Sequence, residues 1–282
     1  MNDLRWEELT HDELVDAKIF STSLSGHRVD VYVPSEVTST TPLLVMHDGK
    51  NLLWPEHSTM GQTWGVIDVV QTLATRPVVV GVWGLVDPQV PAIRYFELAP
   101  QRALEADPSL IGSLLSNGSI PEHEYLGDAY HDMLALELLP QVANFLGLTI
   151  DRTRTALCGS SMGGITSLYG ASRYPEIYGS ALSLSTHWAY WDARIIEAVL
   201  SELPHAPRPR VWIDRGTEEL DALYDGLHER AAAYLASHGW DTPRSLQAKV
   251  YEGTNHSEPV WRERLPEILT WWLDGMSSET SG

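Results

Sequence analysis

The stretch at residues 154–166 constrains the fold of this chain more than any other. A short apolar run ends in Gly-Ser-Ser-Met-Gly at residues 159–163, and a run with helical spacing follows. A Gly-x-Ser-x-Gly turn between a strand and a helix is typical of a nucleophile elbow, where a strained backbone exposes the serine. The helix would direct its first amides and the positive end of its dipole toward Ser161. The pattern predicts a nucleophilic Ser161; the alternative is a glycine-rich turn that packs a helix onto a sheet.

Strand-like and helix-like segments alternate along the rest of the chain. We expect strands at residues 29–33, 43–46, 78–82, 155–158, 181–184, 211–214 and 246–251, and helices at 64–73, 126–146, 165–174, 193–203, 220–238 and 265–273. This alternation predicts an α/β fold with a mostly parallel central sheet flanked by helices. Because no repeat or linker divides the chain, residues 1–276 are expected to form one domain, with 277–282 as a disordered tail.

One segment departs from the alternation. Residues 85–125 contain several prolines and glycines, show little periodicity and follow a strand at the expected carboxyl edge of the sheet. Loops longer than about 12–15 residues in compact domains are often functional. We therefore predict a flap over the site; the alternative is a solvated surface excursion.

Charge and composition exclude several classes of partner. The net charge is 19 minus 38, or −19, which disfavours nucleic acid and anionic membranes. Cys158 is the single cysteine, so an internal disulfide is excluded, and a small buried filler is the simplest interpretation. The start of the sequence has no apolar signal segment, and no apolar run reaches the roughly 18 residues that span a bilayer. A cytoplasmic location is the default expectation, and a homo-oligomer stays open.

Metal and cofactor sites have little support in the sequence. His123 and His131 lie among acidic residues, but no His-Glu-x-x-His or paired-cysteine spacing is present. We expect these two histidines to be solvated on a helix surface and to bind no metal. No glycine-rich phosphate-binding loop follows a strand, so no cofactor is expected.

A serine nucleophile needs a base and an acid, which follow it in this order in α/β-hydrolases. His256 lies between the last expected strand and the last expected helix, where the base should be; a solvated loop histidine is the alternative. The loop after residues 211–214 offers several carboxylates. Asp221 is the first choice for the acid and Glu219 the second, although either could complement a helix dipole instead, and Asp214 could be structural.

The oxyanion hole and the substrate contacts are less defined. One donor would be the amide of Met162, the residue after the nucleophile, and the other the amide of Lys50 in the turn after an early strand. The alternative is that this turn is purely structural. The chain has 11 tryptophans, several near strand ends at the expected site edge. Trp54, Trp64, His187 and Trp188 are predicted substrate contacts, with packing in the core or rim as the alternative.

Several ordered motifs resemble the putative esterase family, which includes esterase D, enterochelin-type siderophore esterases and mycolyltransferases of the antigen 85 group. They are Gly-Ser-Ser-Met-Gly-Gly at 159–164, Met-His-Asp-Gly-Lys-Asn-Leu at 46–52, Arg-Tyr-Phe-Glu at 94–97, Ser-Thr-His-Trp at 185–188 and the run at 253–265. The resemblance extends from about residue 29 to residue 273. It differs at Lys50, where family members commonly carry Gln, and at residues 86–93, which look longer than usual.

The resemblance implies an α/β-hydrolase fold without a large helical cap, and a Ser161–His256 pair that acts on carboxylic esters. The leading hypothesis is a serine esterase that forms an acyl-enzyme and has a small-molecule ester as its substrate. Two alternatives stay open: an acyltransferase that uses the same acyl-enzyme, and a non-catalytic binding protein with the same fold. The sequence does not identify the acyl or the alcohol part of the substrate.

Overall fold

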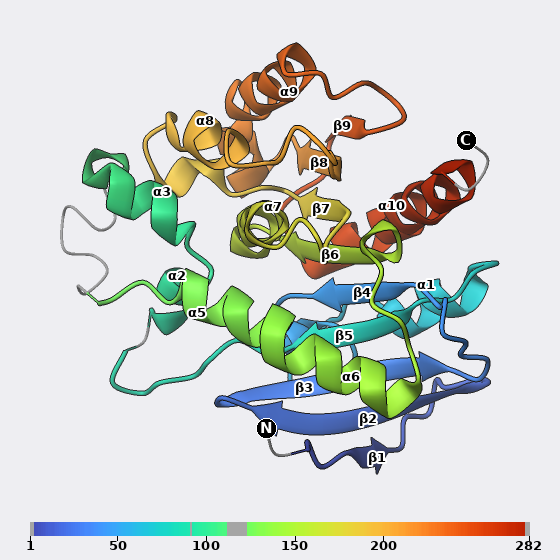
Figure 1. Cartoon of the computed structure of the whole chain (residues 1–282). Helices are drawn as coiled ribbons and strands as arrows, with labels where there is room; N and C mark the ends of the chain where they lie inside the picture. The colour runs from blue at the N-terminus through green and yellow to red at the C-terminus, as the bar shows by residue number, and fades with distance from the viewer. Residues whose placement is uncertain (1–2, 91, 112–122, 280–282) are drawn as a thin grey trace.

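A single twisted sheet organises the fold, which comes from a computed structural model that describes residues 3–90, 92–111 and 123–279. Within these residues nine strands pair in the order β1-β2-β3-β5-β4-β6-β7-β8-β9 (Figure 1). The strands are β1 (Glu7–Leu9), β2 (Ala17–Leu24), β3 (His27–Pro34), β4 (Leu43–Met46), β5 (Val78–Val82), β6 (Thr155–Ser160), β7 (Ser180–Leu184), β8 (Arg210–Gly216) and β9 (Leu246–Tyr251).

The sheet has a small antiparallel part and a larger parallel part. β1, β2 and β3 pair antiparallel with their neighbours, and β3 joins β5 antiparallel. From β5 through β4, β6, β7 and β8 to β9 every pairing is parallel. The predicted mostly parallel sheet is confirmed, and β1 and β2 are additional strands that the sequence analysis did not predict.

Helices cover both faces of the sheet (Figure 1). They are α1 (Val66–Thr72), α2 (Ile93–Glu97), α3 (Gln101–Ala106), α5 (Gly127–Asp132), α6 (Leu139–Leu146), α7 (Met162–Arg173), α8 (Ile195–Leu200), α9 (Leu227–Ser237) and α10 (Glu258–Glu279). The shorter turns are η1 (Gly49–Asn51), η2 (Pro108–Leu110), η4 (Arg152–Arg154), η5 (Trp188–Tyr190) and η6 (Glu219–Tyr224), and the π-helical segment η3 (Met133–Leu138) joins α5 to α6.

The strands contribute to two separate cores because successive side chains point to opposite faces. In β5, Val78, Val80 and Val82 belong to the core under α5, α6, α7 and α8, whereas Val79 belongs to the core under α1 and α10. In β4, Leu43 and Val45 alternate in the same way with Leu44 and Met46. Burial on both faces explains why these strands read as continuous apolar runs.

Most predicted elements differ from the structure by a few residues at their ends, and three differ more. Residues 85–125, expected to be irregular, contain α2 and α3, and residues 91 and 112–122 of the predicted flap lie outside the described residues. The predicted helix at 220–238 is divided into η6 and α9 at Gly226, whose φ of 75° favours glycine. α10 starts earlier than predicted and extends to Glu279, so residues 277–279 of the predicted tail are helical, while 280–282 lie outside the described residues.

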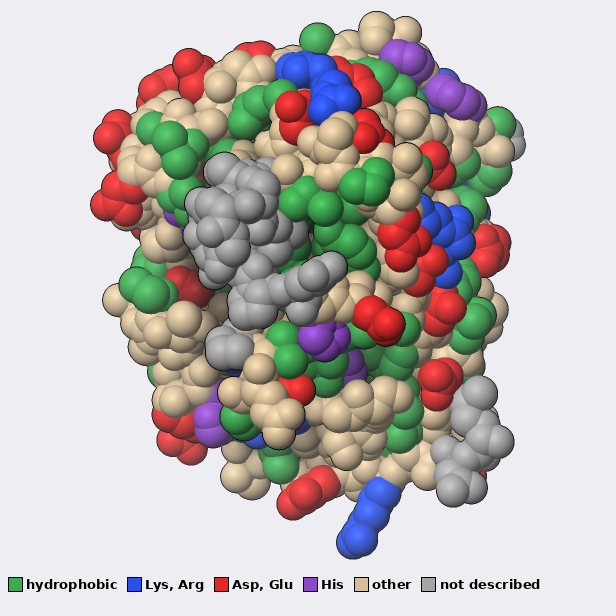
Figure 2. All heavy atoms as spheres, turned by 90° about the vertical axis from the view of Figure 1, so that its left-hand side faces the viewer, with side chains coloured by type: hydrophobic (Ala, Val, Ile, Leu, Met, Phe, Trp, Pro, Cys, Tyr) green, Lys and Arg blue, Asp and Glu red, His purple; other side chains and the backbone are tan. Residues whose placement is uncertain are grey.

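The carboxyl ends of the parallel strands meet at one edge of the sheet, on the left-hand side of Figure 1. Figure 2 shows this face, and hydrophobic and histidine side chains gather near its middle. Ligands of open α/β sheets bind outside the carboxyl ends of the strands. Across the described residues, none of the helices has the length and apolar character needed to cross a membrane.

Candidate active site

Ser161 occupies a sharp turn between β6 and α7. Its backbone has φ 57° and ψ −121°, a conformation that non-glycine residues rarely adopt. The turn is tight because the chain returns close to itself: a Cβ at Gly159 would lie 2.6 Å from the carbonyl carbon of Gly163. The Ser161 amide donates to the carbonyl of Leu184 at 2.9 Å, which ties the elbow to β7. Local strain held by surrounding structure is the geometry that the sequence motif predicts.

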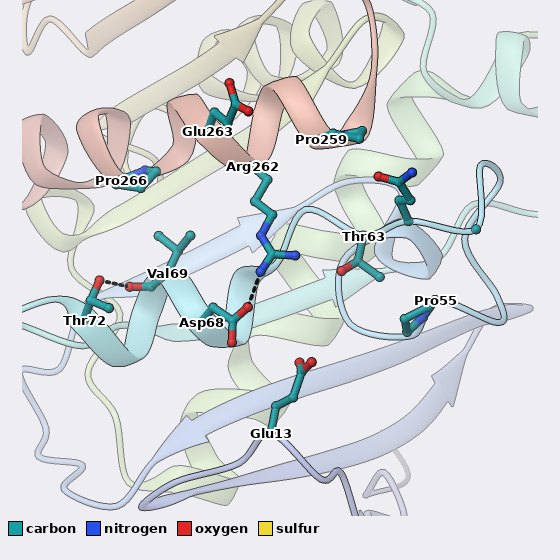
Figure 3. Close-up of a pocket in the computed structure, with 12 residues that line it drawn as sticks. Glu13, Pro55, Thr63, Asp68, Val69, Thr72, Pro259, Arg262, Glu263 and Pro266 are labelled. Atoms are coloured by element: carbon teal, nitrogen blue, oxygen red, sulfur yellow. Dashed lines mark hydrogen bonds and ion pairs between the residues drawn. The ribbon is translucent and has the colours of Figure 1, made fainter.

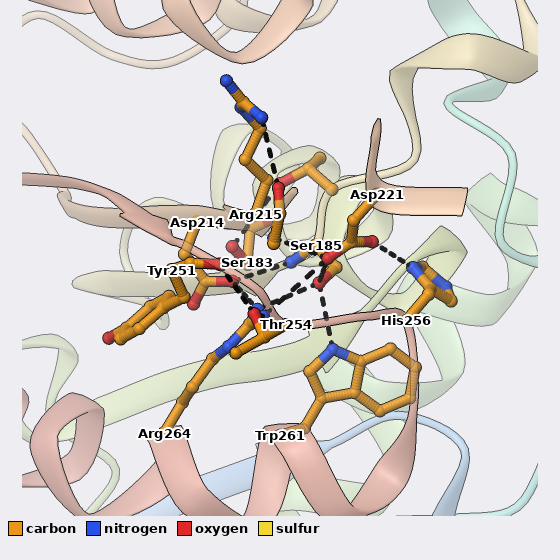
Figure 4. A network of polar contacts seen from close by, with 12 residues as sticks. Ser183, Ser185, Asp214, Arg215, Asp221, Tyr251, Thr254, His256, Trp261 and Arg264 are labelled. Atoms are coloured by element: carbon orange, nitrogen blue, oxygen red, sulfur yellow. Dashed lines mark hydrogen bonds and ion pairs between the residues drawn. The ribbon is translucent and has the colours of Figure 1, made fainter. Parts of the chain in front are cut away.

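His256 and Asp221 come together from two loops. His256 lies between β9 and α10, Asp221 lies in η6, and Nδ1 of His256 is 2.6 Å from Oδ1 of Asp221 (Figure 4). The Asp221 side chain is fully buried, and that of His256 is 12% exposed. Glu219, the second choice for the acid, is exposed and contacts Asn255 instead. Of the two predicted acids, only Asp221 reaches His256.

Further donors fix the Asp221 carboxylate. Oδ2 accepts hydrogen bonds from the hydroxyl of Ser185 at 2.7 Å and from the amide of Gly216 at 2.6 Å. Burial would raise the pKa of Asp221, but the hydrogen bonds from His256 and Ser185 outweigh that effect and lower the pKa below its usual value. An ionised acceptor keeps the hydrogen on Nδ1 of His256, and the opposite nitrogen, Nε2, is then free to accept a proton.

Arg264 of α10 connects this acid to a second buried carboxylate (Figure 4). Its guanidinium donates to Oδ1 of Asp214 at 2.8 Å and to Ser185 at 3.1 Å, and it lies 3.8 Å from Oδ2 of Asp221. The Arg264 side chain is only 2% exposed, and Trp261 also donates to Ser185, at 3.0 Å. Arg264 thus places one positive charge against two buried carboxylates, and its hydrogen bond to Ser185 ties α10 to the residue that donates to Asp221.

The sequence analysis did not identify Arg264, Ser185 or Asp214 as parts of this network. One signal was available for Arg264. It falls on the apolar face of α10 with Trp261, Leu265 and Ile268, which are all buried. A charged residue at a buried helical position requires paired partners.

The predicted oxyanion turn follows β4. Asp48 has φ 55° and ψ 44°, and η1 begins directly after it, so that Lys50 is in its first turn. Arg94 donates to both carboxylate oxygens of Asp48 at 2.6 Å. A Cβ at Gly163 would lie 3.3 Å from Oδ2 of Asp48, which places the turn against the start of α7. Met162 begins α7, and the first amides of a helix have no acceptor within the helix. The structure thus brings the Lys50 turn and Met162 to the same side of the elbow.

The four predicted substrate contacts lie in different environments. Trp188 is fully buried and Trp64 is 2% exposed, so both pack in the interior and present almost no surface to a ligand. Trp54 is partly exposed and donates its ring nitrogen to Asp30 at 3.0 Å. His187 is 6% exposed and lies beside His256, with 6.4 Å between the ring centroids.

The prediction of a solvated His131 is wrong. The side chain is fully buried, and its Nε2 lies 2.9 Å from the hydroxyl of Thr166 in α7. Gly170, one turn further along α7, makes room for the ring, because a Cβ there would lie 2.4 Å from the imidazole. His123 is partly exposed and bonds the carbonyl of Glu124. Within the described residues, no group of three or more His, Cys, Asp or Glu side chains could hold a metal ion.

A groove of about 680 Å³ lies away from Ser161, between α1 and the first turns of α10 (Figure 3). Asp68 and Arg262 form an ion pair across it, and Thr63, Pro259 and Glu263 are among the residues on its walls. None of the residues that line this groove belongs to the set around His256, so it does not contribute to the candidate site.

The model of the protein family described as Putative esterase matches residues 119–272, which is more than half of the chain. The chain belongs to this family. An iron(III) enterobactin esterase of Dickeya dadantii is 24% identical over 154 residues, covering 49% of this chain and 34% of that protein. The matched segment therefore spans about a third of the length of that curated relative.

Solved esterase structures share the fold of this putative esterase family member. The enterochelin esterase of Shigella flexneri has a TM-score of 0.61 at 20% identity, over 92% of this chain and 58% of that one. The enterobactin and salmochelin hydrolase IroE has a TM-score of 0.62 at 17% identity, over 90% of this chain and 96% of that one. The BES protein of Bacillus cereus has a TM-score of 0.62 at 16% identity, over 94% of this chain and 99% of that one. The α/β-hydrolase fold is thereby confirmed, and the described residues form no large helical cap.

Glu97 of α2 is a buried acid whose surroundings disfavour its ionised form. Glu97 is 1% exposed, and its Oε2 accepts from the amide of Leu85 at 3.2 Å. Nδ1 of His27 must donate to the carbonyl of Trp83, 2.8 Å away, so Nε2 of the neutral ring is an acceptor. Oε1 of Glu97 lies 3.3 Å from that nitrogen and has no hydrogen-bond partner among the described residues, so this site offers little to stabilise a charged carboxylate. Burial, aided by Asp48 and opposed by the Leu85 amide and Arg94, raises the pKa of Glu97 to about 8.

This geometry predicts a pH dependence of stability. Glu97 ionises at lower pH in the unfolded chain than in the folded one, so its contribution is complete at acidic pH and is lost as pH rises through about 8. At about 1.4 kcal/mol per pKa unit, the free energy of unfolding should fall by roughly 3 kcal/mol between pH 5 and pH 8 from this group. Glu97→Gln keeps the shape of the side chain without an ionisable group and should remove this part of the pH dependence. Urea unfolding of the wild type and of Glu97→Gln at pH 5 and pH 8 measures this change in the free energy of unfolding. An equal change in both proteins would contradict a raised pKa of Glu97.

Proposed function

We propose that this chain is a serine carboxylesterase that works through an acyl-enzyme. The hydrogen bond of 2.6 Å between His256 and the buried Asp221, on the loops that follow β9 and β8, carries the proposal. The strained backbone of Ser161 supports it, as does membership of an esterase family. A carboxylic ester is the substrate class that this set can cleave.

In the proposed mechanism, the Ser161 hydroxyl turns to His256, whose Nε2 takes its proton during attack on the ester carbonyl. Catalytic hydrogen bonds often form fully only when substrate is bound. The amides of Met162 and Lys50 stabilise the oxyanion, and protonated His256 gives its proton to the leaving alcohol. Asp221 holds the imidazole and stabilises its charged form. Water then repeats these steps, with His256 as base, and releases the acid.

Covalent labelling tests the proposed nucleophile. A fluorophosphonate probe should modify the protein at a single residue, and peptide mass spectrometry should place the adduct on Ser161. Hydrolysis of a panel of p-nitrophenyl, lactone and glycosyl esters then identifies the preferred substrate. An unlabelled Ser161 in the folded protein would reject the serine mechanism and favour a non-catalytic role. Analysis of the products with added alcohols separates hydrolysis from acyl transfer.

A further inference from the structure

Two polar side chains that the proposed mechanism does not use lie directly beside Ser161. Tyr224, at the end of η6, is fully buried, and its hydroxyl is hydrogen-bonded to Nδ1 of His187. The Tyr224 hydroxyl also contacts the hydroxyl of Ser161. The backbone amide of His187 donates to the carbonyl of Ser161 at 3.2 Å, so the elbow and the histidine are fixed to each other.

Tyr224 lies on the same side of Ser161 as His256. The centroids of the Tyr224 and His256 rings are 5.9 Å apart, and those of His187 and His256 are 6.4 Å apart. The predicted oxyanion donors, in contrast, come from η1 and the start of α7. The Tyr224 hydroxyl is therefore placed to meet Oγ of Ser161, the atom that exchanges protons with His256.

Burial determines the protonation of the pair. Burial, aided by His256 and Arg94, lowers the pKa of His187 to about 3, so this ring is neutral near neutral pH. Burial raises the pKa of Tyr224, which keeps its hydrogen. A neutral His187 that carries its hydrogen on Nδ1 donates to the Tyr224 oxygen. In this tautomer, which the inference requires, the Tyr224 hydroxyl is free to direct its hydrogen to Ser161.

We propose that Tyr224, oriented by His187, is a catalytic residue that donates a hydrogen bond to Oγ of Ser161 when this oxygen leaves the acyl-enzyme. The inference rests on the proposed serine mechanism. After water has added to the acyl carbon, the bond from that carbon to Oγ breaks and its electron pair goes to Oγ. His256, protonated by the attacking water, returns a proton to Oγ. Tyr224 keeps its own proton and stabilises the negative charge that develops on the oxygen.

This role affects the two halves of the reaction differently. A donor on Oγ makes Ser161 a better leaving group in deacylation but a weaker nucleophile in acylation. Loss of the donor should therefore slow deacylation selectively. A tyrosine that only packs against the elbow would change both steps, or neither.

The test is the transient kinetics of Tyr224→Phe with p-nitrophenyl acetate. We expect deacylation to slow roughly 100-fold, within the range for loss of one preorganised donor, and acylation to change by less than about threefold. The variant should show a full burst of p-nitrophenol, and an acetylated Ser161 should accumulate in mass spectra. His187→Gln should change deacylation in the same direction by a smaller factor.

Controls separate this inference from the mechanism on which it rests. Tyr178→Phe makes the same change at a fully buried tyrosine whose hydroxyl has no hydrogen-bond partner among the described residues, and it should behave like the wild type. Added hydroxylamine should leave the Tyr224→Phe defect in place, because Ser161 must still depart. Rescue by hydroxylamine, or an equal loss in acylation, would overturn the role of Tyr224. Absence of fluorophosphonate labelling at Ser161 would instead reject the serine mechanism itself.

Discussion

Ser161→Ala is expected to lower kcat/KM for p-nitrophenyl acetate by about 10⁵- to 10⁶-fold, the scale of loss when a catalytic serine is removed. The residual rate would come from the oxyanion donors alone. Alanine has no group that can form an acyl-enzyme, so the fluorophosphonate adduct should disappear as well. Steady-state hydrolysis, with the unfolding midpoint measured in parallel, checks the result.

The neighbouring serine provides the matched control. Ser160 is the last residue of β6 and is 6% exposed. Ser160→Ala should retain activity within about tenfold, because its backbone is part of the strand rather than of the strained turn. Ser161→Gly should be as inactive as Ser161→Ala but more stable, by about 1–2 kcal/mol, because glycine adopts a φ of 57° without strain. An active Ser161→Ala protein would contradict the assignment.

Local sequence patterns were sufficient to predict the parallel strands of the sheet. The strands at residues 43–46, 78–82 and 246–251 have the bounds that the sequence analysis predicts. Each is short, and a proline or a polar residue borders at least one end, which helps to locate it in the sequence. The strand β2, Ala17–Leu24, was missed because it carries few apolar residues, and its pairing with β3 determines its conformation.

Burial of single side chains depended on partners distant in the sequence. The acidic neighbours of His131 suggest a solvated surface, yet Gly170 in another helix leaves the space that its ring fills. In the same way, an apolar face on α10 does not by itself reveal that Arg264 pairs with Asp214 and lies near Asp221. Such pairings are properties of the tertiary structure rather than of a sequence window.

The candidate site likewise contains residues that the sequence could identify and residues that only the tertiary structure identifies. Motif and chain order were enough to select Ser161 and His256 as candidates. They were not enough to choose among the carboxylates in and after β8, because Asp214, Glu219 and Asp221 lie within eight residues of sequence and differ in the direction in which the fold points them. The turn η6, with Glu219 at φ 53°, points Asp221 inward and leaves Glu219 exposed.

Asp221→Asn is expected to lower kcat by about 10⁴-fold, the loss observed when the acid of such a triad becomes an amide. The amide nitrogen cannot accept the hydrogen on Nδ1 of His256, so the ring would take the tautomer that carries hydrogen on Nε2 and could no longer accept the proton of Ser161. Asp221 also accepts from Ser185 and Gly216, so thermal unfolding must show that the variant is folded.

Glu219→Gln is the matched control, since it makes the same chemical change in the same turn. Its exposed carboxylate touches only Asn255, at 3.4 Å, among the described hydrogen-bond partners, and kcat should stay within about twofold of the wild type. The fluorophosphonate probe adds a second measurement: labelling of Ser161 should slow in Asp221→Asn and stay unchanged in Glu219→Gln, because labelling requires the same proton transfer to His256. The opposite pattern, with Glu219→Gln inactive and Asp221→Asn active, would identify Glu219 as the acid and require η6 to rearrange so that its carboxylate reaches His256.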